Sequence, residues 1–208
     1  MGPLNISGSL FLKRGISMSS AFFAMIGRMK YIDRWALMRN TEKESLTSHS
    51  FEVAVIAHGM ALLSNERLGT DYDADRAAVL GLFHDSAEIL TGDMPTPVKY
   101  YNPDIKEAYK KVESAAENQL ISMLPDDLEE QYEEIIKPDD AELRKIVKAA
   151  DKISALIKCI EEEKAGNMEF NKAKESTEKG IRKLDCPAAD LFMEEFIPAY
   201  SLTLDQLQ

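Results

Sequence analysis

Apolar residues recur at helical spacing along nearly the whole chain, and this periodicity constrains the fold more than any other feature of the sequence. Segment 139–164 shows it most clearly, because Ile146, Ile153 and Ile160 fall on one side of a helix. No segment alternates apolar and polar residues with the period of two that is typical of strands. The length of 208 residues is enough for one domain with a sizeable core and too short for two ordinary domains. We therefore predict an all-α, single-domain fold of about seven or eight helices.

Capping residues and breaks in the periodicity place the boundaries of these helices. Asn102-Pro103-Asp104 is a strong helix start, with a cap, a proline in the first turn and an acid at the positive end of the helix dipole. The two prolines in segment 91–98 exclude a helix there and indicate a stiff loop. Residues 1–17 carry few structure signals and are predicted to be either a loose extension or the result of an upstream start before Met18, ahead of a domain over 18–208. The predicted helices are 20–31, 48–65 (capped by Thr47 or Ser48), 74–90 (capped by Asp73), 102–123, 139–164, 168–183 and 187–197.

The composition narrows the possible classes of function. The formal net charge is −11, with 36 acidic against 25 basic side chains. A chain with no basic stripe cannot neutralise many phosphates, which argues against nucleic-acid polymers and anionic membranes as partners. No uninterrupted apolar run approaches the roughly 18 residues that a membrane helix requires, and the N-terminus lacks the pattern of a signal peptide. Cys159 and Cys186 form no CxxC pair and are expected to be reduced thiols, so we expect a cytoplasmic protein.

Three ionisable residues converge in the apolar segment 83–89. Burying the adjacent pair His84-Asp85 is costly unless both side chains are paired or bind a cation. Glu88 follows His84 by four positions, so on a continuous helix it projects from the same side. The segment is either the polar edge of an amphipathic helix or a metal site beside a carboxylate that handles protons. The local pattern favours the metal site.

The two other histidines and one aspartate are less decisive. His49 lies on the apolar side of the helix predicted over 48–65, so we expect it to face the core. His58 is half a turn away from His49 at about 100° per residue, and we interpret it as a hydrogen-bonded core residue. Asp151 follows two alanines beside the isoleucine face of segment 139–164. Two interpretations of Asp151 are equally open: it is a solvated residue on the flank of a helix, or it belongs to a functional site.

The order of these residues is specific. His49, then His84-Asp85, then Asp151 reproduces the H…HD…D order of the HD-domain metal-dependent phosphohydrolases. Longer stretches resemble the YfbR-type 5′-deoxynucleotidases, and the likeness covers residues 18–205. The resemblance implies a single HD-domain helical bundle. The stretches are DRWALMRN at 33–40, HDSAEILTGDMPTPVKY at 84–100 and DKISALIKCIEE at 151–162.

The resemblance implies one divalent cation, held by a mixed set of nitrogen and oxygen ligands that leaves positions open for water and phosphate. In this family the ion is a transition metal, and we expect cobalt or manganese. The resemblance also implies that Glu88 orients or deprotonates the attacking water. Arg34 would hold the 5′-phosphate, a task suited to the planar fork of a guanidinium. The implied metal ligands are His49, His84, Asp85 and Asp151.

Further implied contacts surround the sugar of a deoxyribonucleotide. Trp35, the only tryptophan, matches a residue that leaves no room for a 2′-hydroxyl, so that ribonucleotides are excluded. Asp93 is placed to accept from the 3′-hydroxyl. Ser48 departs from the family pattern, where a glutamate is expected, and this affects the surroundings of the ligands only. The implied substrate-binding residues are Arg34, Trp35, His49, Asp85, Asp93, Met94, Pro95, Thr96 and Asp151.

The implied function is hydrolysis of 2′-deoxyribonucleoside 5′-monophosphates to deoxynucleoside and phosphate by a homodimer, with helices near 105–136 at the interface. Two alternatives stay open at this point. The chain could be an HD phosphohydrolase that cleaves a triphosphate, an alarmone or a phosphodiester, or a helical binding module without activity. Glu88 and Arg34 argue against the module, because a pure binding site has no use for a carboxylate that handles water.

Overall fold

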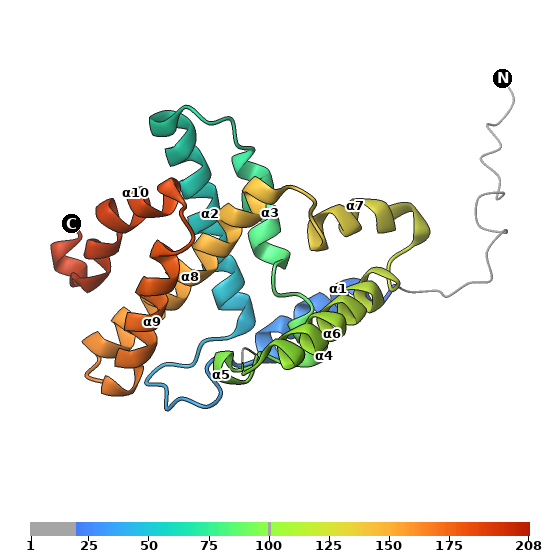
Figure 1. Cartoon of the computed structure of the whole chain (residues 1–208), viewed down its shortest axis with the longest axis horizontal. Coiled ribbons are helices and arrows are strands. Elements are labelled where there is room, and N and C mark those ends of the chain that lie inside the picture. The colour runs from blue at the N-terminus through green and yellow to red at the C-terminus, as the bar shows by residue number, and fades with distance from the viewer. Residues whose placement is uncertain (1–19, 100) are drawn as a thin grey trace, which may run out of the picture.

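Three helices, α2 (Leu46–Leu68), α3 (Ala74–Phe83) and α8 (Ala141–Lys164), pack against one another at the centre of the computed structural model (Figure 1). Helix α9 (Asn171–Arg182) packs on α8, and α10 (Pro187–Glu195) lies against both α2 and α8. The structure describes residues 20–99 and 101–208, so the predicted extension 1–17 lies outside the described residues. The shared core contains Val53, Ile56, Leu80, Ile153 and Ile157, all almost fully buried.

Helices α2 and α3 approach each other closely because Gly81 has no side chain. A Cβ placed on Gly81 would lie only 2.8 Å from the Cα of Ala54 on α2. Since real Cβ atoms do not come so close to backbone, any larger residue at this position would push the two helices apart. The contact therefore sets the distance between the segment that carries His49 and the end of the helix that precedes His84.

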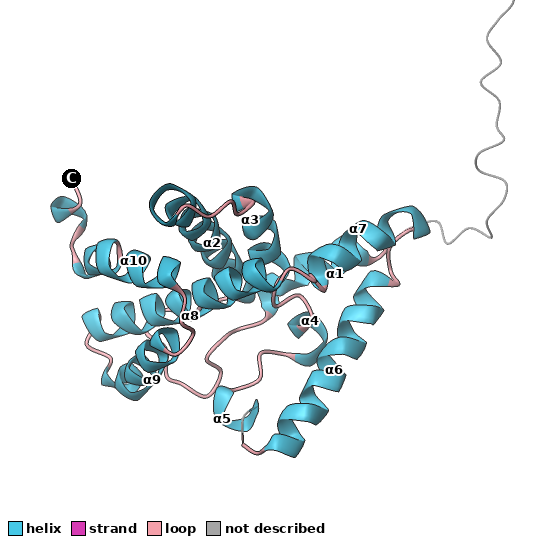
Figure 2. Ribbon diagram, turned by 45° about the horizontal axis from the view of Figure 1, so that its top comes forward, coloured by secondary structure: helices cyan, strands magenta, loops and turns pink. Residues whose placement is uncertain are grey.

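A second group of helices covers the other flank of the molecule. Figure 2 shows α6 (Pro103–Ile121) and α7 (Asp126–Ile136) on the side away from α9 and α10. They share a smaller core with α1 (Phe22–Ile26), in which the rings of Phe22 and Tyr132 lie 4.7 Å apart edge to face. This group reaches the central bundle through the contact of α7 with α3.

The all-α prediction is confirmed for the described residues, which contain no strand and only one isolated bridge, between Asp33 and Ser45. Seven of their α-helices have nine or more residues, namely α2, α3, α6, α7, α8, α9 and α10. Asn102 and Asp73 cap α6 and α3 as predicted. Helix α2 begins earlier than predicted and is capped by Ser45 instead of Thr47 or Ser48, because the hydroxyl of Ser45 accepts from the backbone N–H of Ser48.

Several predicted boundaries are wrong. The helix predicted over 74–90 breaks into α3 and the short α4 (Glu88–Thr91). The loop predicted over 91–98 contains one helical turn, α5 (Thr96–Lys99). Its Pro97 stands in the first turn, where a helix needs no N–H donor. Helix α7 lies in the range 105–136 in which helices were predicted, but its boundaries were not. At one end of three predicted helices the chain forms a separate 3₁₀ helix, namely Gly27–Tyr31, Met168–Phe170 and Ile197–Ser201. A further 3₁₀ helix, Leu204–Gln206, follows near the C-terminus.

Helix α2 is the central element of the bundle. By length and composition alone it is also the one helix among the described residues that could cross a membrane. The search of the sequence for uninterrupted apolar runs did not identify this helix. Of its most apolar 18-residue window, 56% is buried inside the fold. One side of the helix packs against α3, α8 and α10, whereas its large apolar residues Phe51, Val55, Leu62 and Leu68 are exposed.

Candidate metal centre

Two histidines and two aspartates meet where α2, α8 and the turn after α3 converge. One ligand atom from each of His49, His84, Asp85 and Asp151 lies within 4.8 Å of the others. Nε2 of His84 is 3.0 Å from Oδ2 of Asp85, and Nε2 of His49 is 3.3 Å from Oδ1 of Asp151. Both Nε2 atoms are buried, yet neither has a hydrogen-bond partner among the described residues. Buried polar atoms are rarely left unpaired, so this set of donors fits a bound cation.

The break after α3 orients His84 and Asp85. From Phe83 onward the backbone forms short-range turn bonds, from Ser86 N–H to Phe83 carbonyl and from Glu88 N–H to Asp85 carbonyl. Nδ1 of His84 donates to the carbonyl of Gly81 at 2.8 Å. The ring therefore carries a proton on Nδ1, and its Nε2 is directed toward Asp85. A straight helix through this segment, as the sequence periodicity predicts, would not contain this turn.

The charges within the cluster favour ionised carboxylates. Burial, followed by the nearby Arg34, lowers the pKa of His49, so its ring is neutral. Although burial opposes it, the charge of His84 holds the pKa of Asp85 well below its usual range. For His84 burial again acts in the opposite direction, but Asp85 and Asp151 raise its pKa to about 9. Without a cation, the positive charge of the protonated His84 ring thus offsets the charges of Asp85 and Asp151.

Glu44 joins Arg34 and Trp35 at the edge of this centre. Its Oε2 accepts from Nε of Arg34 at 3.0 Å and from the indole N–H of Trp35 at 2.9 Å. The guanidinium of Arg34 also donates to Oδ2 of Asp85 at 3.2 Å. Arg34 is therefore held between a candidate metal ligand and Glu44. Sequence reasoning missed Glu44, since a single acid in a polar loop gives no signal of its own.

Trp35 has a backbone conformation that residues other than glycine seldom adopt, with φ at 58°. Its backbone N–H donates to Oδ2 of Asp93 at 3.2 Å, and its ring packs against Phe170 at 5.3 Å. Two carboxylates, Asp93 and Glu44, thus hold the tryptophan in a strained position. Met94 and Pro95 are half-buried beside Asp93, whereas Thr96 is exposed at the start of α5.

Glu88 is 6% exposed, and its Oε2 has no hydrogen-bond partner among the described residues. Burial, together with the charges of Asp85 and Asp93, raises the pKa of Glu88 to about 9. In the protein without a cation this carboxyl therefore holds a proton at neutral pH. A carboxyl whose pKa is displaced this far, next to a cluster of metal-ligand type, is a candidate acid or base.

The loop that carries Arg34 and Glu44 is anchored to the end of α8. Glu162 is 2% exposed, and its carboxylate accepts from the backbone and hydroxyl of Thr41 and from the side chains of Lys158 and Asn167. Although burial opposes ionisation, these donors lower the pKa of Glu162. The buried carboxylate thus fastens a loop of irregular backbone to a rigid helix.

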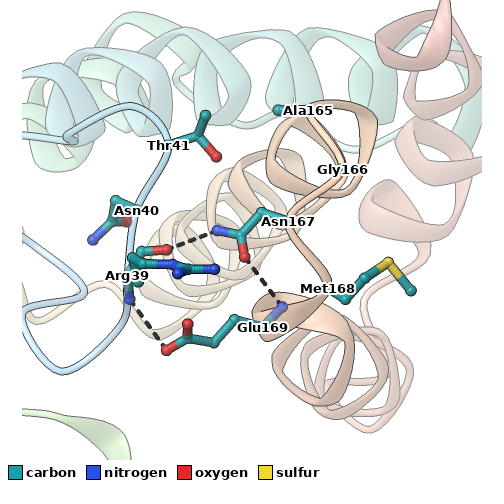
Figure 3. Close-up of a pocket in the computed structure, with 8 residues that line it drawn as sticks. All are labelled: Arg39, Asn40, Thr41, Ala165, Gly166, Asn167, Met168 and Glu169. Atoms are coloured by element: carbon teal, nitrogen blue, oxygen red, sulfur yellow. Dashed lines mark hydrogen bonds between the residues drawn. The ribbon is translucent and has the colours of Figure 1, made fainter.

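Figure 3 shows a surface pocket next to this anchor. Nδ2 of Asn167 donates to the carbonyl of Arg39 at 2.7 Å, and the backbone N–H of Arg39 donates to Glu169 at 3.1 Å. Among the described residues that line the pocket, none is a predicted site residue. The lining is Arg39, Asn40, Thr41, Ala165, Gly166, Asn167, Met168 and Glu169. We therefore regard these contacts as structural support for the loop.

His58 lies away from this cluster, and our interpretation of it as a core residue is wrong. Its side chain is 40% exposed and its Nε2 is 3.6 Å from Oδ1 of Asp75 on α3. The reason is geometric, since α2 turns one side to the core and His58 falls on its flank. His49, by contrast, is 1% exposed, as predicted.

Comparisons with known proteins agree with this geometry. Residues 21–200 match the family described as 5′-deoxynucleotidase YfbR-like. A 5′-deoxynucleotidase from Vibrio vulnificus (strain YJ016) is 46% identical over 190 residues, which cover 90% of this chain and 98% of that protein. A 5′-deoxynucleotidase from Shewanella oneidensis is 44% identical over 190 residues, covering 90% of this chain and 97% of that protein.

Two solved structures share the fold at lower identity. An HD-domain phosphohydrolase from Listeria innocua has a TM-score of 0.76 at 24% identity and covers 86% of this chain and 87% of its own. The HD phosphohydrolase of cyanophage S-2L, bound to dA and one catalytic Zn²⁺ ion, has a TM-score of 0.63 at 19% identity, with 86% and 96% covered. These likenesses agree with the predicted HD-domain helical bundle.

Proposed function

This chain belongs to the YfbR-like 5′-deoxynucleotidase family, and on that premise we propose that it is a metal-dependent phosphomonoesterase that hydrolyses 2′-deoxyribonucleoside 5′-monophosphates. Curated relatives of that name are 44–46% identical over about 90% of the chain. The observation that carries the proposal is the pair of buried, unpartnered Nε2 atoms that face Asp85 and Asp151. Arg34 and Glu88 lie beside this pair with the chemistry that phosphate hydrolysis needs.

In this proposal His49, His84, Asp85 and Asp151 hold one divalent cation. When bound, the cation supplies Lewis acidity to a water molecule and to a phosphate oxygen. Arg34 keeps its charge, because the carboxylates of Asp85, Asp151 and Glu44 raise its pKa against the effect of burial. Its guanidinium can therefore neutralise the transferring phosphoryl group. No covalent enzyme intermediate is needed, since the attacking group is water.

Glu88 is the proposed acid–base residue. Its carboxyl holds a proton in the metal-free protein, and the positive charge of a divalent cation nearby favours its ionised form. Once ionised, the carboxylate can accept a proton from the attacking water and align the water with the phosphorus atom. Its Oε2 has no partner among the described residues, which leaves this atom available for the water.

Trp35 and Asp93 are proposed to recognise the sugar. The indole of Trp35 is held by Glu44 and Phe170, so it cannot move aside to admit a 2′-hydroxyl. Asp93 already accepts from the backbone of Trp35 through Oδ2, and its other oxygen can accept from a 3′-hydroxyl. Met94, Pro95 and Thr96 continue this segment and are proposed to contact the substrate from the same side.

Several finer features belong to the same proposal. Cobalt or manganese suits the mixed nitrogen and oxygen ligands. A cytoplasmic location is supported by two buried cysteines that are unpaired thiols in the described structure.

A homodimer that uses α6 and α7 is supported by the exposed side chains of Ile105, Val112 and Leu128. The proposed catalytic domain spans residues 18–208. Light scattering of the wild type and of Val112→Lys tests the dimer, which the substitution should dissociate.

A phosphate-release screen tests the activity. Deoxy- and ribonucleoside 5′-monophosphates are incubated with the protein and cobalt, manganese or magnesium. We expect free phosphate from dAMP and none from AMP, and we expect Glu88→Ala to abolish release. Pyrophosphate or triphosphate released from a larger nucleotide would instead identify another HD phosphohydrolase. Binding of dAMP without turnover would identify a binding module.

A further inference from the structure

A line of three side chains runs from the metal centre through α8 to the outer side of α2. Nδ1 of His49 lies 2.9 Å from Oγ of Ser154, and both residues are almost fully buried. Oγ of Ser154 donates to Oε2 of Glu52 at 2.5 Å. Glu52 is half-buried and lines a separate cavity that also contains Lys158. We call these three residues the His49–Ser154–Glu52 relay.

The direction of these hydrogen bonds follows from the number of protons available. A serine hydroxyl has a single proton, and an ionised carboxylate can only accept. The hydroxyl of Ser154 therefore donates a hydrogen bond to Glu52 and accepts one from the Nδ1–H of His49. In this tautomer the ring proton is on Nδ1, so the other ring nitrogen, Nε2, carries a bare lone pair. That nitrogen is the one that faces Asp85 and Asp151.

We propose that Ser154 and Glu52 are positioning residues that hold His49 in its Nδ1–H tautomer and so prepare Nε2 to bind the cation. The proposal rests on the metal centre of the proposed function. Histidine ligands generally depend on such a partner at the second ring nitrogen for both tautomer and orientation. The two histidines differ in this respect, because His84 uses the backbone carbonyl of Gly81 for the same purpose. Only His49 depends on side chains that a substitution can remove.

The chain offers closely matched controls for both positions. Ser50 is a buried serine next to His49 whose Oγ has no hydrogen-bond partner among the described residues, so Ser50→Ala removes a buried hydroxyl outside the relay. Glu161 lines the same cavity as Glu52, so Glu161→Gln removes a neighbouring carboxylate. Burial raises the pKa of Glu52 to about 7, and measurements are therefore made near about pH 8.5, where it is ionised.

The first experiment reads the tautomer directly in the metal-free protein. The chain has three histidines, so nitrogen NMR of a sample labelled with ¹⁵N-histidine resolves each ring. In the wild type we expect His49 to be protonated at Nδ1 and bare at Nε2. In Ser154→Ala this preference should be lost, while the His84 signals remain as an internal reference and Ser50→Ala matches the wild type. A purely structural role for Ser154 would leave the His49 tautomer unchanged.

The second experiment measures the affinity for manganese by calorimetry. Loss of a partner behind a metal-binding histidine weakens metal affinity by about 10- to 100-fold, and we expect this from Ser154→Ala and from Glu52→Leu. Glu52→Gln keeps an oxygen that can accept from Ser154, so it should restore most of the affinity lost in Glu52→Leu. Glu161→Gln and Ser50→Ala should bind manganese like the wild type.

The outcomes separate this proposal from the proposed function. A wild-type His49 protonated at Nε2, or a Ser154→Ala variant with unchanged tautomer and affinity, would overturn the relay whatever the activity. A protein that binds manganese through an intact relay but releases no phosphate from any nucleotide would refute the proposed function and still support the relay. A wild type that binds neither manganese nor cobalt would overturn both.

Discussion

At the scale of single residues, one oxygen of Glu44 holds the two side chains proposed to recognise the phosphate and the sugar. In Glu44→Ala both Arg34 and Trp35 lose this acceptor, and a hydrogen bond with a charged partner contributes about 1.5–3 kcal/mol. We therefore expect kcat/KM for dAMP to fall by about 10- to 100-fold. Steady-state kinetics checks this, with Glu42→Gln, an exposed acid of the same loop, as the control. An unchanged kcat/KM would show that Glu44 does not organise the site.

Trp35 is expected to decide between deoxyribose and ribose. Its ring is fixed by Glu44 and Phe170, so the selection acts by exclusion and not by a contact with the 2′-hydroxyl. Trp35→Ala should therefore admit AMP and lower the ratio of kcat/KM for dAMP over AMP by at least about tenfold. Parallel assays of both nucleotides give the ratio. If it stays the same, another residue makes the selection.

Metal binding should release protons at neutral pH. In the metal-free protein the pKa of His84 is about 9, because Asp85 and Asp151 outweigh the effect of burial. Nε2 of His84 must lose its proton before it can bind a cation. Below about pH 9 the affinity should therefore rise by about tenfold per pH unit. Calorimetry in buffers of different ionisation enthalpy counts the protons.

Glu88→Gln is the suitable background for that count, since it removes the other group whose pKa lies at about 9. In this variant we expect release of about one proton per manganese at pH 7.5. A release close to zero would mean that His84 is already neutral in the free protein.

The sequence predicted which candidate ligands would meet, but not the residues that support them. His49, His84, Asp85 and Asp151 were predicted from their order along the chain, and the structure brings them together. Ser154 lies 105 positions from His49, and neither its polarity nor its spacing distinguishes it from other serines in helices. Such contacts depend on how two helices cross, which the periodicity of each helix does not specify.

At the scale of elements, the close crossing of α2 and α3 sets the position of the candidate metal ligands. Gly81→Ala would place a Cβ 2.8 Å from the Cα of Ala54, so the helices must separate. Overpacking of this kind costs about 1–3 kcal/mol. We expect a lower melting temperature together with weaker manganese binding, because the shift also moves the carbonyl that holds His84.

Gly59→Ala is the matched control, since the nearest atom to its added Cβ is a ring carbon of Phe192 at 3.9 Å. Alanine in the interior of a helix is favoured over glycine by about 0.5–1 kcal/mol, so this variant should be as stable as the wild type or more so. If Gly81→Ala behaves in the same way, the crossing tolerates a larger distance than the structure indicates.

Periodicity also has a limit at this scale. It predicts where the long helices lie, because each must bury one side. It does not predict the break between α3 and α4, since the apolar spacing continues through residues 84–87 while the backbone turns. The break contains the candidate ligands His84 and Asp85. Departures from local sequence preference are expected at functional sites.

At the scale of the whole molecule, the net charge of −11 describes the exposed helix faces more than the site. At the site itself Arg34 and the protonated ring of His84 offset the aspartates in the free protein. A divalent cation would take over that role. The charges of the aspartates are therefore balanced both without and with the cation, and the fold is already formed before the cation binds. The cation should then stabilise the folded state only because it binds that state, by mass action.

Manganese should raise the melting temperature accordingly. At a free concentration 100 times the dissociation constant, binding adds about 2.7 kcal/mol, which for a chain of this size corresponds to about 5–10 °C. Asp151→Asn removes a charged ligand and should abolish most of the increase. His58→Ala removes a histidine that contacts Asp75 outside the centre and should keep it. Thermal scans with manganese and with EDTA measure the difference for each protein. An equal increase in Asp151→Asn would place the stabilising ion elsewhere on the acidic surface.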